Sequence, residues 1–446
     1  MELDMTKGSP FRLIVRFAIP IILGNLFQQL YSMVDTVIVG RYVGVKALAA
    51  VGATGTITFL IIGFLQGMTT GFTVLTAQRF GAGDGEGMKR SVGSAIVLSV
   101  IVTVVMTAGS VLGMDWLLRV MQTPEDIMDM SRTYIVIICW GLGCTALYNL
   151  IASILRAIGN SRVPLYFLIL SAFLNVAGDI VLIVYFRMGV AGAALATVAS
   201  QGISGILCLA YLVKKVPILS LEKEHFRLEK WCVRNQLSIG FPMALQFGIT
   251  AVGTILVQVA LNLLGSTVVA SYTAVFKIEG LVLQMFQALG MTMATYCGQN
   301  RGIGDLGRIK KGSRIAFGIS TVYSVAIYVI VLVTLPAVIG LFITGDVTDV
   351  LGYSRTYMTI NGVFFTTVGM IFIYRNVLQG CGYGFWPMMG GVVELLARAV
   401  FAIIAAWKRS FIGVCTANAS AWFAGGIFLY VVYRLLMRKM EREKCE

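Results

Sequence analysis

Charged and amide side chains interrupt several long apolar segments of this 446-residue chain. Asp35 and Asp179 are two such acids, and Asn175 precedes Asp179 by one helical turn, so these two residues share a helix face. Two carboxyl groups close together in apolar surroundings are suited to taking up a proton or holding a small cation between them. The sequence therefore predicts a proton or cation site, and the elements that carry these residues decide whether they meet.

The composition identifies those elements as membrane-spanning helices. Apolar residues make up 58% of the chain and charged residues 13%, whereas a soluble chain carries about 25% charged residues. At about 20 residues per span, twelve segments are apolar enough to cross a bilayer. They are approximately 13–39, 47–75, 91–113, 130–155, 163–186, 190–213, 235–264, 267–297, 315–340, 351–378, 386–406 and 412–433. We therefore predict an all-α integral membrane protein.

The 35 Lys and Arg residues are distributed unevenly between the two sides of these spans. The side that carries both termini holds about three times as many as the other, which is the bias of cytoplasmic loops. We expect both termini in the cytoplasm and the chain in the inner membrane of a prokaryote. The net charge of +14 then reflects topology and not a nucleic-acid-binding surface.

The chain repeats itself internally. Segments 66–89 and 131–134 share residues at matching positions with segments 287–310 and 354–357. With six spans per half, the two halves have the same orientation, related by a pseudo-two-fold axis along the membrane normal. We predict two six-helix bundles, an architecture that secondary transporters use.

Domain boundaries follow from this repeat. Residues 1–213 form the predicted N-terminal lobe, 214–234 a polar cytoplasmic linker, and 235–446 the C-terminal lobe with its basic tail. The linker holds the chain's one histidine, His225, which lies outside any span and is expected to be solvated.

A glycine-rich motif follows the second span of each half, as Gly81 to Asp84 and Gly302 to Asp305. A loop of this kind could hold a phosphate group. Because no strand precedes either copy, we interpret both as tight turns that need glycine torsion angles.

The depth of the acids in the membrane can be estimated from the loops. Asp179 lies nine residues before the turn near Met188 and Thr197 nine residues after it, so both lie roughly 13 Å deep on neighbouring antiparallel helices. Asp35, Asn175, Asp179 and Thr197 could then form one polar cluster in the outer half of the N-terminal bundle. The alternatives are that Asp35 reaches outer water and that the other three make only structural hydrogen bonds.

Other polar residues within the spans suggest weaker roles. Glu394 and Arg398 are four residues apart and are expected to form a structural ion pair. Glu279 could contact a cationic substrate or serve structure alone. The remaining candidates for a substrate cavity are Gln66, Gln246 and Gln287.

Taken together, these motifs resemble the multidrug and toxic compound extrusion (MATE) family over essentially the whole chain. The matching segments are Pro20 to Gly40 with Val34-Asp35-Thr36, Ala77 to Asp84, Leu155 to Asn160 before Pro164, and the pair Asn175 and Asp179. The resemblance implies a V-shaped exporter of varied organic cations that exchanges them for protons or sodium by alternating access.

The resemblance also implies site residues. The family's N-lobe cation site uses an Asp on the first span, an Asn and an Asp four apart on the fifth, and a Thr on the sixth, which match Asp35, Asn175, Asp179 and Thr197. The sodium-coupled NorM-like branch has acids on spans seven and ten, and this chain has none there. The pattern is therefore closer to the DinF-like branch, with proton and sodium both open as coupling ion.

Three other functions would each require different residues. A lipid-linked precursor flippase of the same superfamily would use intramembrane cations such as Lys277, Arg375 and Arg398. The loop after span two does not carry the sequence motif expected of a major-facilitator carrier. A membrane transferase would need an Asp-rich motif or a histidine within a span, and the sequence has neither. We expect no enzyme activity, no cofactor and no metal beyond a coupling sodium. The expected partners are membrane lipids and small organic cations, with no nucleotide or nucleic acid, and the chain is expected to be a monomer.

Overall fold

The computed structural model describes residues 3–342 and 348–445, which are helical except for short connections. Helices of the first half are α1 (Pro10–Tyr42), α2 (Val45–Gly81), α3 (Gly85–Val120), α4 (Glu125–Trp140), α5 (Leu142–Ala157), α6 (Arg162–Asp179) and α7 (Gly189–Lys215). Those of the second half are α8 (Lys230–Asn262), α9 (Ser266–Gly302), α10 (Leu306–Phe342), α11 (Thr348–Gly362), α12 (Phe365–Gly380), α13 (Phe385–Lys408) and α14 (Phe411–Cys445).

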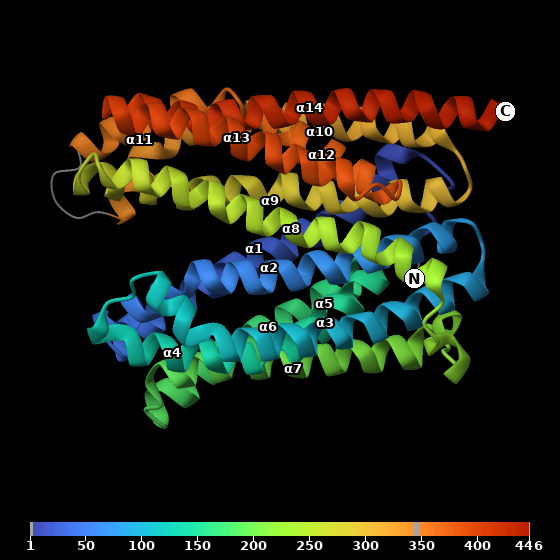
Figure 1. The fold of residues 1–446 in the computed structure, drawn as a ribbon, viewed down its shortest axis with the longest axis horizontal. Helices are drawn as coiled ribbons and strands as arrows, with labels where there is room; N and C mark the ends of the chain where they lie inside the picture. Colours follow the sequence, from blue (N-terminus) through green and yellow to red (C-terminus); the bar gives the residue numbers. More distant parts are fainter. Residues whose placement is uncertain (1–2, 343–347, 446) are drawn as a thin grey trace. The chain divides into compact units, whose positions relative to one another are not determined.

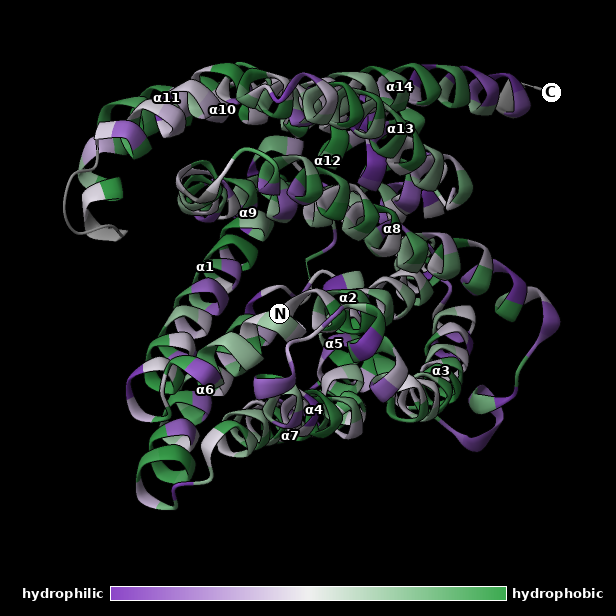
Figure 2. Cartoon of the chain, turned by 60° about the vertical axis from the view of Figure 1, so that its left-hand side comes forward, coloured by the Kyte–Doolittle hydropathy of each residue, from purple (hydrophilic) through white to green (hydrophobic). Residues whose placement is uncertain are grey.

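Ten of these helices are single candidate spans within the described residues, and two bent pairs raise the number to twelve. The pair α4 and α5 bends by 46°, and the pair α11 and α12 bends by 51°. These pairs correspond to the predicted fourth and tenth spans, so the bend is part of the repeated unit. The all-helical membrane fold is confirmed, whereas the two breaks were not predicted. Figure 2 shows hydrophobic residues along the helices and hydrophilic ones gathered at helix ends and connections.

The described residues form two compact units. The first consists mainly of Ile19–Phe247, and the second of Met5–Ala18 with the chain from Gly248 onward. The N-terminal part of α1 therefore belongs to the second unit and the rest of α1 to the first. For α8 the assignment is reversed, with its N-terminal part in the first unit and the rest in the second. Within each unit the helices lie side by side (Figure 1).

Two large apolar clusters hold the first unit together. One joins α2, α3, α5 and α7 through residues such as Phe72, Val92, Ile151 and Leu212. The other joins α1, α4 and α7 at the opposite end of the helices, with Val39 and Ile135 fully buried. Within a bilayer such clusters are stabilised by close van der Waals packing between helices, because lipid tails are as apolar as the side chains themselves.

The second unit relies more on aromatic side chains. Tyr296, Phe286 and Phe365 are among its largest fully buried residues. The segment before α1 joins this unit through hydrogen bonds, since the Met5 amide donates to Gln299 Oε1 at 2.8 Å and Arg308 donates to the Met5 carbonyl at 3.0 Å.

The two glycine-rich motifs are tight turns, as the sequence indicates. Gly83 and Gly304 have φ angles of 71° and 70°, in the left-handed region that favours glycine. The aspartate that follows each glycine caps the next helix, because Asp84 accepts from the Gly87 amide and Asp305 from the Arg308 amide, both at 2.8 Å. Both motifs thus end one helix and start the next, and their capping carboxylates would repel a phosphate.

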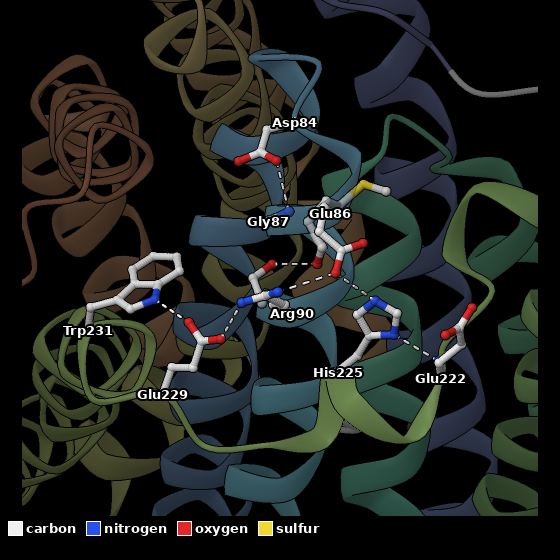
Figure 3. A network of polar contacts seen from close by, with 10 residues as sticks. Asp84, Glu86, Gly87, Arg90, Glu222, His225, Glu229 and Trp231 are labelled. Atoms are coloured by element: carbon white, nitrogen blue, oxygen red, sulfur yellow. Dashed lines mark hydrogen bonds and ion pairs between the residues drawn. The ribbon is translucent and has the colours of Figure 1, made fainter.

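The linker departs from the prediction at His225. This residue lies outside the spans as expected, but its side chain is buried and not solvated. Its Nδ1 accepts from the Glu222 amide at 2.8 Å, so the ring proton is on Nε2, which lies 3.1 Å from Glu86 Oε1 (Figure 3). The hydrogen bond from His225, followed by that from Arg90, holds the pKa of Glu86 below its usual value.

The burial of His225 has a local cause in α3. The 3-10 turn Lys223–Phe226 packs directly on Gly93, where an added Cβ would lie 2.1 Å from the His225 carbonyl oxygen. Val216 and Leu219 of the same linker join the apolar cluster of the first unit. The linker is therefore part of the first unit and packs against α3 and α7.

A Gly93→Ala variant tests this packing. We expect it to lower the free energy of unfolding by roughly 1–3 kcal/mol, because the new methyl group must displace the linker backbone. The measurement is denaturant-induced unfolding in detergent. Gly109→Ala is the matched control, since it is on the same helix with nothing within 4 Å of the added Cβ, and alanine favours helix there by up to about 1 kcal/mol. Equal effects of the two substitutions would contradict the close contact.

Candidate functional site

Asp35 of α1 and Asp179 at the end of α6 face each other within the first unit. Asp179 is fully buried and Asp35 half-buried, and their carboxyl groups are close enough to interact directly. Three of their four oxygens, Oδ1 of Asp35 and both of Asp179, are buried without a hydrogen-bond donor among the described residues. Because carboxylates only accept hydrogen bonds, two carboxyl groups placed in this way are able to share a proton or to hold a cation between them.

Asn175 and Thr197 lie on the helices that flank this pair. Asn175 Nδ2 donates to Thr197 Oγ1 at 3.3 Å, and the Thr197 hydroxyl donates to the Ala193 carbonyl at 3.0 Å. These bonds direct the donors away and leave Asn175 Oδ1 buried without a donor in the part of the chain that the structure describes. Since Asn175 and Asp179 share a face of α6, the acceptor oxygens gather on one side of that helix. Oxygen acceptors alone are the ligands of hard cations.

The backbone widens directly after Asp179. Ile180–Tyr185 forms a π-helical turn, in which the Phe186 amide bonds to the Val181 carbonyl at 3.0 Å. Single π-turns within helices are frequent at functional sites because they change the direction of neighbouring side chains. Nothing in the sequence indicates this turn, since its residues are uniformly apolar.

Tyr134 of α4 lies beside the candidate site, and the sequence analysis does not include it. It is buried and lies near both Asp35 and Asp179, close enough for their charges to act on its hydroxyl. A signal for it was present, because Tyr134 belongs to the segment Ser131 to Tyr134 that recurs as Ser354 to Tyr357.

The second unit has a polar cluster of its own at the repeated tyrosine. The Tyr357 hydroxyl donates to Glu279 Oε2 at 2.6 Å, and Asn418 Nδ2 donates to the Tyr357 oxygen at 3.0 Å and to the Tyr272 oxygen at 3.2 Å. Glu279 is therefore buried and hydrogen-bonded. In each half the repeated tyrosine lies beside an intramembrane acid, but the acids come from different helices, α1 and α6 in the first unit and α9 in the second.

The residues predicted to line a substrate cavity are divided between the two units. Gln66 and Gln246 belong to the first unit and Gln287 and Glu279 to the second. Gln246 and Glu279 are buried, Gln66 is half-buried and Gln287 is exposed. A common role for these four residues stays a prediction.

The predicted ion pair between Glu394 and Arg398 is corrected. Glu394 of α13 instead pairs with Arg375 of α12, and the two side chains are only 14% and 15% exposed. Arg398 lies near Glu279 and packs against Gly253 of α8. Residues four apart on one helix share a face, but here the neighbouring helix supplies a closer partner for the carboxylate.

Comparison with protein families gives one match that covers most of the chain. The family model described as MatE matches residues 20–181 and again residues 242–404, so each half carries one copy. Among curated proteins, the chain is 28% identical to the "Probable multidrug resistance protein YpnP" of Bacillus subtilis over 96% of both chains. It is 24% identical to the "Probable multidrug resistance protein NorM" of Thermotoga maritima, over 84% of this chain and 81% of that protein.

Solved structures share the fold. An outward-facing multidrug resistance MATE family transporter of the MOP superfamily superposes with a TM-score of 0.92 at 22% identity, covering 98% of both chains. A MOP superfamily transporter from Pyrococcus furiosus superposes with the same score at 23% identity and the same coverage. Both confirm the helical membrane architecture.

The pair Arg375 and Glu394 gives a testable expectation. Arg375→Gln leaves Glu394 enclosed without its cation, so we expect the free energy of unfolding to fall by about 3 kcal/mol or more, and Arg375→Gln with Glu394→Gln to restore much of it. Unfolding by denaturant in detergent measures both. The control is Arg132→Gln, whose partner Asp115 is exposed, and we expect it to change the free energy of unfolding much less than Arg375→Gln does. A similar small loss in all variants would mean that the pair is solvated.

Proposed function

Since the chain belongs to the MatE family, we propose that it is a secondary multidrug exporter that exchanges small organic cations for protons or sodium. The observation that carries the coupling step is the pair Asp35 and Asp179, whose facing carboxyl oxygens lack donors among the described residues. The relatives named as probable multidrug resistance proteins support small drugs as the substrate class.

The proposed mechanism is antiport by alternating access. Uptake of a proton or sodium ion at Asp35 and Asp179 neutralises the repulsion between the two carboxylates, and this stabilises the state from which the organic cation has left. Asn175 and Thr197 add neutral oxygens and hold the helices α6 and α7 in register around the pair. One positive charge moving inward supplies about 2.3 kcal/mol per 100 mV, and each tenfold ion gradient adds about 1.36 kcal/mol.

The basic side of the helices is proposed to face the cytoplasm, with both termini there. The excess of Lys and Arg in the connections on that side supports this orientation. Organic cations then enter the protein from the cytoplasm and leave on the outer side. The membrane potential opposes this export, and the inward movement of the coupling ion drives it.

The coupling ion is proposed to bind in the first half, as in the DinF-like branch. The acids of the second half support this assignment, because Glu279 is bonded to Tyr357 and Glu394 to Arg375. The same pairs weigh against a lipid-linked precursor flippase, since Arg375 and Arg398 lie beside carboxylates and offer less positive charge to a phosphate group.

Substitution of the paired carboxyls tests the coupling. We expect Asp35→Asn and Asp179→Asn each to reduce efflux of a fluorescent organic cation from proteoliposomes at least tenfold, because a neutral amide no longer exchanges a charge. The assay imposes a proton gradient and a sodium gradient separately, which identifies the ion. Asp126→Asn, at an exposed acid paired with Lys46, should stay within about twofold of wild type. Wild-type efflux in both site variants would overturn the proposal.

A further inference from the structure

A cavity of about 500 Å³ lies in the second unit between α10, α12 and α14, at the end where α10 begins and α14 ends. Its wall carries four cationic side chains against one carboxylate. These residues are Lys310, Arg314, Arg434, Arg438 and Glu441. The carboxylate is already engaged, because Glu441 pairs with Lys310. The cavity therefore presents a surplus of positive charge.

Only some of the cationic side chains of this cavity have partners within the protein. Arg434 donates to the Tyr430 hydroxyl at 2.9 Å and lies over the ring of the same tyrosine. Arg314 and Arg438 are exposed and have no ion-pair partner within residues 3–342 and 348–445. Two guanidinium groups are thus left to bind an anion, and guanidinium suits phosphate because its N–H groups match two oxygens at once.

The rest of the wall is aromatic and apolar. Tyr374, Tyr430 and Tyr433 line the cavity together with Phe317 and Met370. Tyrosine is favoured where a membrane meets water, since its ring is apolar and its hydroxyl polar. A wall of this composition suits a ligand with a charged head and an apolar body.

The internal repeat shows what covers this place in the first half. Arg314 corresponds to Gly93 when the repeated segments are matched through Lys89 and Lys310. There the backbone of the linker turn packs on Gly93, and Val216 and Leu219 of the linker join the apolar cluster formed by α2, α3, α5 and α7. In the second half, no described segment packs on Arg314 in this way. The scaffold thus has one groove filled by its own chain and an equivalent groove lined with arginine.

We propose that this cavity binds the phosphate of an anionic membrane lipid, with Arg314 and Arg438 holding the phosphate oxygens and Phe317 and Met370 contacting the glycerol and upper acyl carbons. The position favours a lipid over a soluble phosphate, because the cavity lies at the basic ends of membrane-spanning helices and combines charge with an apolar wall. Basic pockets between such helices on the cytoplasmic side are suited to anionic headgroups. The assignment does not depend on which cation the protein transports.

The test measures retention of radiolabelled phosphatidylglycerol by the immobilised full-length protein in detergent. We expect the double variant Arg314→Gln with Arg438→Gln to weaken retention roughly thirtyfold. Each removed charge costs about 1 kcal/mol of binding free energy, and about 1.4 kcal/mol corresponds to a tenfold change in affinity. The matched control is Lys311→Gln with Lys439→Gln, which removes the same charge from the same two helices outside this cavity, and should change retention less than about threefold. Phosphatidylcholine of the same chain length should be retained weakly by all forms.

Three results would overturn the proposal. Equal losses in the two double variants would indicate general attraction to a basic surface, and equal retention of both lipids would remove the role of charge. Competition by millimolar inorganic phosphate would assign the cavity to a soluble anion. If the double glutamine variant does not fold, the single variant Arg438→Gln replaces it in the test, because Arg438 is exposed near the end of α14. Its lipid retention should fall roughly fivefold.

Discussion

Two carboxyl groups that face each other inside a membrane-spanning bundle set the main constraint on this molecule. An ionised side chain at the centre of a span costs on the order of 2.5–3.5 kcal/mol, so it must find a partner. In the second unit the acids do so within the protein, as Glu279 bonds to Tyr357 and Glu394 to Arg375. Asp35 and Asp179 have each other instead. We propose that their missing partner is a mobile proton or cation, which is the property that an ion-coupled transporter requires.

The two halves keep one scaffold and differ in the polar groups that it carries. In both, the fourth span is a bent pair of helices, and a tyrosine lies beside an intramembrane acid. The groove at their basic ends also differs. The position of Gly93, which lies under the linker backbone, is taken in the second half by Arg314, which lines a charged cavity. Duplication supplies two equivalent places, and substitution at a few residues gives them separate uses.

Much of the architecture could be predicted because the bilayer imposes length and composition on every span. The repeat and the tight turns at Gly83 and Gly304 follow from residue types alone. Loop distances predicted that Asp179 and Thr197 lie at the same depth, with Asn175 one turn away, and the structure joins Asn175 to Thr197 by a hydrogen bond. Their role in ion binding stays a prediction.

Other features depend on packing that sequence spacing does not encode. The partner of Glu394 comes from a neighbouring helix and not from the next turn of its own. His225 is buried because α3 offers a glycine surface, although the linker around it is polar. The π-turn after Asp179 lies in a uniformly apolar segment. In each case the deciding contact is between elements far apart in the chain.

The most direct measurement of ion binding at Asp35 and Asp179 is the charge displacement that follows a rapid rise in proton or sodium concentration, recorded from proteoliposomes on a solid-supported membrane without organic cation. The wild-type protein should give a transient current for one of these ions, and Asp179→Asn should give none. A current of wild-type size in Asp179→Asn would contradict the assignment of the coupling ion to this pair.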